Sequence, residues 1–194
     1  MKNEGVPSWR IATLIVTQPR TIMRKLDTMI EVVKRVKELG IEPKATMFLH
    51  ALRVRSSMND STWEKKINVL KSLGWSEKEI LTAFKKCPLY LIRSEEKMRV
   101  VADFCFNTAK LDPEVVIFYP KLFMCALDNR LRRRYKVLEV LKAKNLLKSK
   151  KIAWMLLVAE KRFVEICVLK HLDEIPNLMD VYRGNVAAET SSVQ

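Results

Sequence analysis

The apolar positions of this chain recur with the spacing of an α-helix. Between residues 63 and 73 large apolar side chains stand three or four residues apart, and residues 80–84 resume the pattern after a short break. Because this spacing gathers apolar side chains on one helical face, it predicts helices and not strands. The chain has only 4 glycines in 194 residues, which disfavours tight β-hairpins. We therefore expect an all-α protein.

Turn signals recur at a nearly constant distance along the chain. Similar segments at 37–43, 71–77, 107–114 and 142–149 each follow a lysine-rich or apolar helical stretch. Their central residues are Gly40, Gly74, Lys110 and Asn145, which lie 34, 36 and 35 residues apart. Glycine and asparagine suit the left-handed conformation that ends helices, so Lys110 is the poorest match. The recurrence predicts structural repeats.

Helix-start and helix-end signals divide each repeat into two helices. Start signals are the Ser76-x-x-Glu79 and Ser61-x-x-Glu64 patterns and the Asp112-Pro113 pair. Pro88 and Pro120 are expected to end the helix that follows each turn. Because each helix pair has apolar faces on both sides, we predict an α-solenoid of about four helix-pair repeats of roughly 35 residues, forming a curved superhelix.

The predicted repeats set the expected domain boundaries. Residues 1–19 are interpreted as the remnant of an upstream repeat, 20–184 as the helical repeat domain and 185–194 as a disordered C-terminal tail. In the first helix, near Ser8 to Thr17, Trp9 and Ile15 would have no preceding helix to pack against. We therefore expect an exposed apolar end, available for self-association.

The charge of the chain indicates the kind of partner that the protein binds. Its formal net charge is +14 and its pI about 9.8, which favours nucleic acid as a partner, then an anionic membrane surface, then an acidic protein. The longest apolar run, residues 152–159, is too short to span a bilayer. The positive charge is concentrated in residues 130–151, where 10 of 22 residues are Arg or Lys and only Glu139 is acidic.

A helical projection places several of these cations opposite an apolar face. Arg130 and Arg134 flank that face, where their guanidinium groups are expected to stay free. Cations near the start of the next helix oppose its dipole, which suggests a bound phosphate. The predicted nucleic-acid-binding residues are Arg130, Arg132, Arg133, Arg134, Lys136, Lys144, Lys148, Lys150 and Lys151. A weaker set, interleaved with acidic residues, is Arg20, Arg24, Lys25, Lys34 and Arg35. A solvated helix face is the alternative interpretation.

Catalytic and metal-binding patterns are missing from the sequence. The 4 cysteines are scattered without a C-x-x-C pair, so we predict reduced thiols, no metal site and no cofactor. Phosphate-binding loops and H-E-x-x-H patterns do not occur, and we do not expect an enzyme. The aromatic residues that fall on the apolar period are predicted to lie in the core: Trp63, Trp75, Phe84, Phe104, Phe118 and Phe123.

Three segments together resemble one known family. They are LGWSEKEILTAFKKCPLYLIRSEEKM at 73–98, LDPEVVIFYPKLF at 111–123 and KRFVEICVLKHLDEIPNLMDVYRG at 161–184. The combination resembles the mitochondrial transcription termination factor (mTERF) family in its land-plant form. The resemblance implies a helical solenoid in mitochondria or chloroplasts. It further implies binding of double-stranded DNA or organellar RNA, in transcription regulation, transcription termination or intron splicing.

Two departures from the family pattern affect what can be carried over. Plant members usually carry a Ser-Leu-Glu-Lys-Arg-like stretch followed by Pro-Arg. The matching residues here are Ala126, Leu127, Asp128, Asn129, Arg130, Arg133 and Arg134. The proline is replaced by Arg133, which predicts an uninterrupted helix. Family members also normally begin with a transit peptide and further repeats, so the chain looks N-terminally truncated.

Two further functions stay open at this stage besides a regulator that binds double-stranded DNA. The first is an RNA-binding factor for organellar intron splicing. The second is a helical scaffold that grips an acidic protein.

Overall fold

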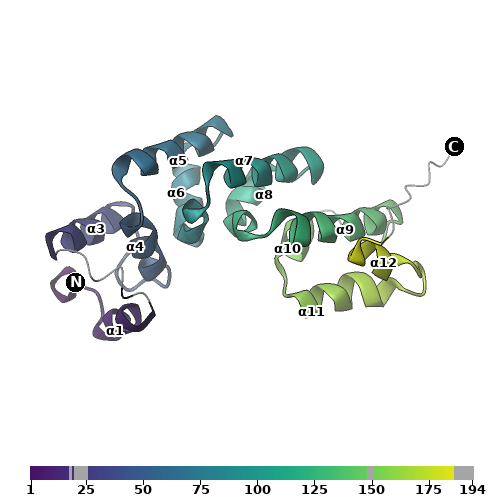
Figure 1. Cartoon of the computed structure of the whole chain (residues 1–194), viewed down its shortest axis with the longest axis horizontal. Coiled ribbons are helices and arrows are strands. Elements are labelled where there is room, and N and C mark those ends of the chain that lie inside the picture. The colour runs from purple at the N-terminus through teal and green to yellow at the C-terminus, as the bar shows by residue number, and fades with distance from the viewer. Residues whose placement is uncertain (18, 20–25, 148–150, 186–194) are drawn as a thin grey trace. The chain divides into compact units, whose positions relative to one another are not determined.

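The computed structural model describes residues 1–17, 19, 26–147 and 151–185 (Figure 1). These residues form α-helices and short 3-10 and π-helical segments, with no strand among them. The all-α prediction is confirmed. The helices gather into two compact units, Met1–Ala102 and Asp103–Gln194. The predicted boundaries at residues 19 and 184 stay predictions, and residues 186–194 lie outside the described residues.

The first unit packs paired helices around a core of aliphatic and aromatic side chains. Its elements are η1 (Lys2–Glu4), α1 (Ser8–Thr17), α3 (Leu26–Glu38), α4 (Phe48–Ser56), α5 (Asp60–Ser72), α6 (Glu77–Lys86), η2 (Pro88–Ile92) and most of α7 (Glu95–Asp103). Helix α4 packs against both α3 and η2. The α3–α4 contact brings Val36 and Phe48 into one core, from which water is excluded.

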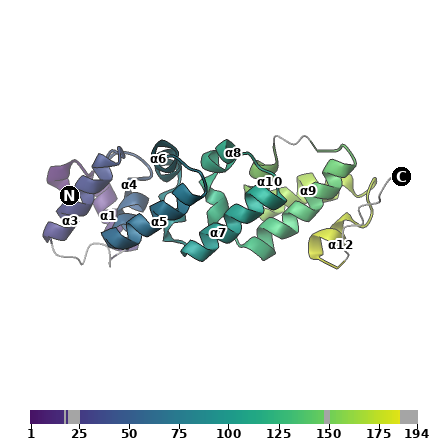
Figure 2. The same ribbon diagram turned by 90° about the horizontal axis from the view of Figure 1, so that it is seen from above.

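The second unit is organised around α9. Its elements are η3 (Phe104–Thr108), α8 (Pro113–Phe118), η4 (Pro120–Met124), η5 (Leu127–Arg132), α9 (Arg133–Ala143), α10 (Ile152–Leu157), α11 (Glu160–Phe163), η7 (Val164–Val168), η8 (Leu169–His171) and α12 (Leu178–Arg183). Helix α12 lies beside α9 in both views (Figures 1 and 2), and η7 and α10 also contact α9. Leu138 of α9 and Phe163 of α11 are fully buried in this core.

The four predicted turn residues share one backbone conformation. Their φ angles are 72° at Gly40, 86° at Gly74, 50° at Lys110 and 59° at Asn145. Positive φ is uncommon for residues with a side chain, although asparagine adopts it more readily than most, so its recurrence at Lys110 shows that the repeat imposes this turn even on an unfavourable residue. The structure thus confirms the turn positions, including Lys110, the poorest match by residue type.

The helix-start predictions were right at two helices and displaced at a third. Helix α8 begins at Pro113 with Asp112 as its N-cap residue. Ser76 and Glu79 form the predicted capping box at the start of α6. Helix α5 begins at Asp60, and its cap is Asn59, whose side chain accepts a hydrogen bond from the Thr62 amide at 2.8 Å. The predicted Ser61 cap is therefore wrong. Asparagine caps at least as well as serine, and Asn59 precedes Ser61 in the chain.

Large apolar side chains are exposed on α1 and at the end of α8. On α1, Leu14 is buried whereas Trp9 and Val16 are 63% and 81% exposed, so the predicted apolar end exists. Self-association through it stays a prediction. Phe118 was predicted to lie in the core but is 56% exposed. It is the last residue of the six-residue helix α8, where the helical period no longer determines which side chains are covered.

Candidate nucleic-acid interface

The basic stretch, residues 130–151, includes the end of η5 and all of α9. It ends at Lys151, the N-cap residue of α10. The chain is helical without a break from Leu127 to Ala143, although its first six residues have π-helical hydrogen bonding. The replacement of proline by Arg133 is consistent with this continuity, because a proline would remove a backbone donor there. Lys148 and Lys150 lie outside the described residues.

Four of the predicted residues have exposed side chains: Arg132, Lys136, Lys144 and Lys151. Arg132 donates a hydrogen bond to Asp128 one turn earlier, at 2.7 Å. For the three lysines, no carboxylate among the described residues forms an ion pair. Within the described part of the chain, these three positive charges are therefore left without an ion-pair partner.

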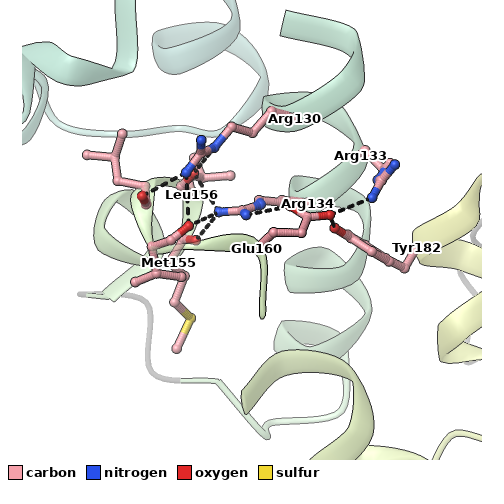
Figure 3. A network of polar contacts seen from close by, with 9 residues as sticks. Arg130, Arg133, Arg134, Met155, Leu156, Glu160 and Tyr182 are labelled. Atoms are coloured by element: carbon pink, nitrogen blue, oxygen red, sulfur yellow. Dashed lines mark hydrogen bonds and ion pairs between the residues drawn. The ribbon is translucent and has the colours of Figure 1, made fainter. Parts of the chain in front are cut away.

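Arg134 was predicted to present a free guanidinium group, and that prediction is wrong. The side chain is 1% exposed. Its Nη1 atom donates to the carbonyl oxygens of Met155, Leu156 and Val158, at 3.3, 3.1 and 2.6 Å (Figure 3). The guanidinium also lies over the Phe163 ring, 4.6 Å from its centroid. Arg134 is thus a structural residue inside the second unit.

Arg130 also donates hydrogen bonds to carbonyls at the C-terminal end of α10. Its Nε and Nη2 atoms donate to the carbonyl oxygens of Leu156, Leu157 and Val158, at 3.3, 2.8 and 2.9 Å. The last four carbonyls of a helix have no partner within it, and α10 is only six residues long. Arg130 and Arg134, one turn apart, satisfy these carbonyls with positive charge, which the negative end of the helix dipole also favours. This physical demand explains why neither guanidinium is free.

Glu160 ties three other side chains together at the start of α11. Its Oε2 accepts from Arg134 at 2.8 Å, and its Oε1 accepts from Arg133 at 2.7 Å and from the Tyr182 hydroxyl (Figure 3). Partial burial alone would raise the pKa of Glu160. The hydrogen bond from Tyr182 and the two guanidinium groups outweigh burial and hold that pKa below its usual range. Arg133 also lies over the Tyr182 ring, 4.1 Å from its centroid.

Glu160 and Tyr182 were not among the predicted site residues. Glu160 is 26 residues from Arg134 and Tyr182 a further 22, and neither stands in a recognisable pattern with the arginines. The available signal was the position of Glu160 itself, three places after the end of α10, because acidic residues are enriched in the first turn of a helix.

The weaker predicted set is only partly described. Lys34 is exposed on α3, and Arg35 forms ion pairs with Glu31 at 2.8 Å and with Asp60. Asp60 also binds Arg55, a buried arginine that the sequence interpretation missed. Arg20, Arg24 and Lys25 lie outside the described residues. Arg35 is therefore already compensated by two carboxylates, and of the described pair only Lys34 has an uncompensated charge.

Other candidate chemistry is limited in the described part of the chain. An apolar cavity of about 290 Å³ in the first unit is lined mainly by Leu39, Trp63 and Phe84 and lies apart from the basic helix in sequence. Among the described residues, no three His, Cys, Asp or Glu side chains are grouped to hold a metal ion. None of the described helices is long and apolar enough to cross a membrane.

A protein-family model matches most of the chain. The mTERF family model matches residues 1–164, which include both units up to the start of η7. No curated protein matches the chain. Family membership indicates nucleic-acid binding and an organellar, transcription-related role, whereas the land-plant type and the truncation stay predictions. Since the match covers well over half of its length, the chain belongs to the mTERF family.

Proposed function

We propose that this chain binds double-stranded DNA through the exposed cations of α9 and its flanks, and regulates transcription or transcription termination in an organelle. The observation that carries this proposal is a group of exposed lysines on α9 and beside it, Lys136, Lys144 and Lys151, for which the described residues supply no ion-pair partner. Uncompensated lysines gain most from a polyanion, because binding releases condensed counterions without first breaking an internal ion pair.

The spacing of the exposed cations suits a phosphate backbone. Arg132 and Lys136 are one helical turn apart, and Lys144 follows after about two more turns. At 1.5 Å per residue, the three charges extend over about 18 Å of helix. Several phosphates of a duplex fall within that length. Such contacts position the protein and supply affinity, whereas base contacts would supply sequence preference.

We further infer that the chain acts by binding and not by catalysis. Two carboxylates beside the basic helix already form ion pairs with arginines. Asp128 pairs with Arg132, and Glu160 with two arginines and Tyr182. Glu160 is a poor general base, because the groups that bind it stabilise its charged form and hold its pKa below the usual range.

The test is a triple charge reversal on the exposed face, with Arg132→Glu, Lys136→Glu and Lys144→Glu combined. We expect affinity for a short DNA duplex to fall at least about a hundredfold near 0.1 M salt. The slope of log affinity against log salt should become shallower by about 2.7, or 0.9 for each phosphate contact. Far-UV circular dichroism should show unchanged helix content.

A matched control separates the proposed face from overall charge. Lys121→Glu, Lys161→Glu and Lys170→Glu combined make the same charge change at exposed positions of the same unit. Equal losses of affinity in both triple variants would show that net charge alone causes the loss. Unchanged affinity in the α9 variant would refute the interface.

The choice of ligand in the same measurement addresses the alternatives. Tighter binding to organellar intron RNA than to duplex DNA would favour a splicing factor. Absence of salt-sensitive binding to either nucleic acid would favour a scaffold for an acidic protein.

A further inference from the structure

Glu160 holds its two arginines under different conditions. Arg134 is buried, and besides Glu160 it has three backbone carbonyl acceptors. The Arg133 side chain is 37% exposed, and its Nη2 donates to Glu160 Oε1. Because Arg134 is enclosed by protein, only Arg133 can exchange its carboxylate for an acceptor that arrives from solvent.

Release of Arg133 would leave Glu160 well satisfied. Oε2 would keep Arg134, and Oε1 would keep the Tyr182 hydroxyl. The Glu160 side chain is 58% exposed, so water can also replace the lost donor. An exposed ion pair of this kind contributes at most about fivefold to an equilibrium constant. The Arg133–Glu160 pair is therefore weak enough to be replaced by a multivalent anion.

Arg133 is also oriented to accept a second anion. Its guanidinium is stacked on the Tyr182 ring, which restricts the group to a plane. Its Nε is buried, so the part of the guanidinium that an anion can reach lies beyond this atom, in the exposed portion of the side chain. The planar donor fork that matches a carboxylate also matches a phosphate. Arg133 directly follows Arg132, which belongs to the exposed basic face.

We propose that Glu160 competes with a nucleic-acid phosphate for Arg133, so that the carboxylate acts as an internal substitute for the phosphate. Binding transfers Arg133 from Glu160 to the ligand, and Tyr182 keeps the guanidinium in place during the exchange. Glu160 thereby lowers the affinity of the free protein for polyanions. This inference rests on the proposed function and specifies how the same surface is regulated.

The experiment is a double-mutant cycle measured by equilibrium binding to a short DNA duplex over a series of salt concentrations. The proteins are the full chain, Arg133→Ala, Glu160→Gln and the two combined. Glutamine keeps an oxygen that can accept from Arg134 while removing the charge. We expect Glu160→Gln to raise affinity about two- to fivefold near 0.1 M salt when Arg133 is present. When residue 133 is alanine, only the smaller effect of removing one negative charge should remain.

A matched variant controls for net charge. Glu165→Gln removes another carboxylate of the second unit, one that pairs with Arg162 at 3.6 Å. It should alter affinity by the same small factor whether or not Arg133 is present. An equal gain from Glu160→Gln in both backgrounds, or a loss of affinity on that substitution, would overturn the competition.

Tyr182→Phe provides an opposite perturbation if Glu160→Gln unfolds the second unit. The ring under Arg133 remains, but Oε1 loses the hydroxyl that shares it, so Glu160 should hold Arg133 more tightly. Affinity should fall, and only while Arg133 is present. A gain in affinity would contradict the proposal. If the unaltered chain shows no salt-dependent binding at all, the proposed function fails instead.

Discussion

The two units contain clusters of the same construction around Asp60 and Glu160. Each carboxylate is the first residue of a helix, α5 or α11, and binds one buried and one half-exposed arginine. In both clusters the buried guanidinium lies over an aromatic ring three residues after the acid. Arg55 lies 5.4 Å from the centroid of Trp63, and Arg134 4.6 Å from that of Phe163.

A common physical cause explains the shared construction. A carboxylate at a helix start is favoured by the positive end of the helix dipole. A residue three positions later lies on the same side of the helix, so its ring can cover the cation that the carboxylate attracts. The combination lets a chain with many cations bury an arginine without leaving its charge unpaired.

The difference lies in what the buried arginine holds. Arg55 donates to two nearby groups, the Met58 carbonyl and Asp60. Arg134 reaches three carbonyls at the end of α10 as well as Glu160, and Glu160 in turn binds Tyr182 of α12. The buried arginine of the first cluster closes the local turn between α4 and α5, whereas the buried arginine of the second connects α9 with α10 and α11. The same local pattern thus places a buried arginine on a turn in one unit and on a contact between distant helices in the other.

The largest effect should come from removing the two buried arginines in turn. Arg134→Met should lower the free energy of unfolding by about 3 to 5 kcal/mol, because the α10 carbonyls and Glu160 lose their partner in a buried site. Arg55→Met should cost about 1 to 3 kcal/mol, since fewer buried acceptors depend on it. Denaturant unfolding followed by circular dichroism measures both. Equal costs would remove the distinction between a local and a tertiary role.

Acid should weaken the Glu160 cluster more than the Asp60 cluster. Both pKa values are lowered in the folded protein, from ordinary values of 4.5 for Glu160 and 3.8 for Asp60. A lowered pKa contributes stability above the unfolded-state pKa, and that contribution is lost as pH falls below it toward the folded-state pKa. The loss for Glu160 should therefore begin near pH 4.5.

Melting temperatures of the wild type and Glu160→Gln between pH 6 and pH 3 test this expectation. The difference between the two proteins should shrink as the pH falls, because glutamine has no proton to gain. Asp60→Asn should show a smaller change in this range, since the ordinary pKa of Asp60 is 3.8 and the loss of its contribution begins at a lower pH. A constant difference at all pH values would contradict the assigned role of the Glu160 charge.

The smallest effect concerns the turns that close the repeats. The first unit uses Gly40 and Gly74 at the positive-φ position, whereas the second begins with Lys110. Lys110→Gly should raise the free energy of unfolding by about 0.5 to 1 kcal/mol, because glycine adopts this conformation without steric cost.

Gly74→Ala is the reverse control for that substitution. An added methyl group there would meet no atom within 4 Å, so its cost of about 1 kcal/mol would come from the backbone conformation alone. Denaturant unfolding measures the pair. Destabilisation by Lys110→Gly would show that the lysine side chain stabilises its turn in another way.

The sequence by itself determined the features that depend on neighbouring residues. The all-α class, the turns at Gly40, Gly74, Lys110 and Asn145, and the capping box of Ser76 and Glu79 are interactions within a few residues. Helical periodicity also indicated correctly that Lys136 and Lys144 are exposed. Such features can be predicted from the sequence because the residues that cause them lie close together in the chain.

Only the tertiary structure decided which arginines are available to a ligand. The periodicity placed Arg130 and Arg134 beside the apolar face of α9, a position from which a long side chain can turn either outward or inward. The unsatisfied carbonyls of α10, 21 to 28 residues later in the chain, turned both inward. A local pattern states the direction in which a side chain leaves its helix. The acceptors that other helices bring within its reach determine whether its charged group is buried or exposed to solvent.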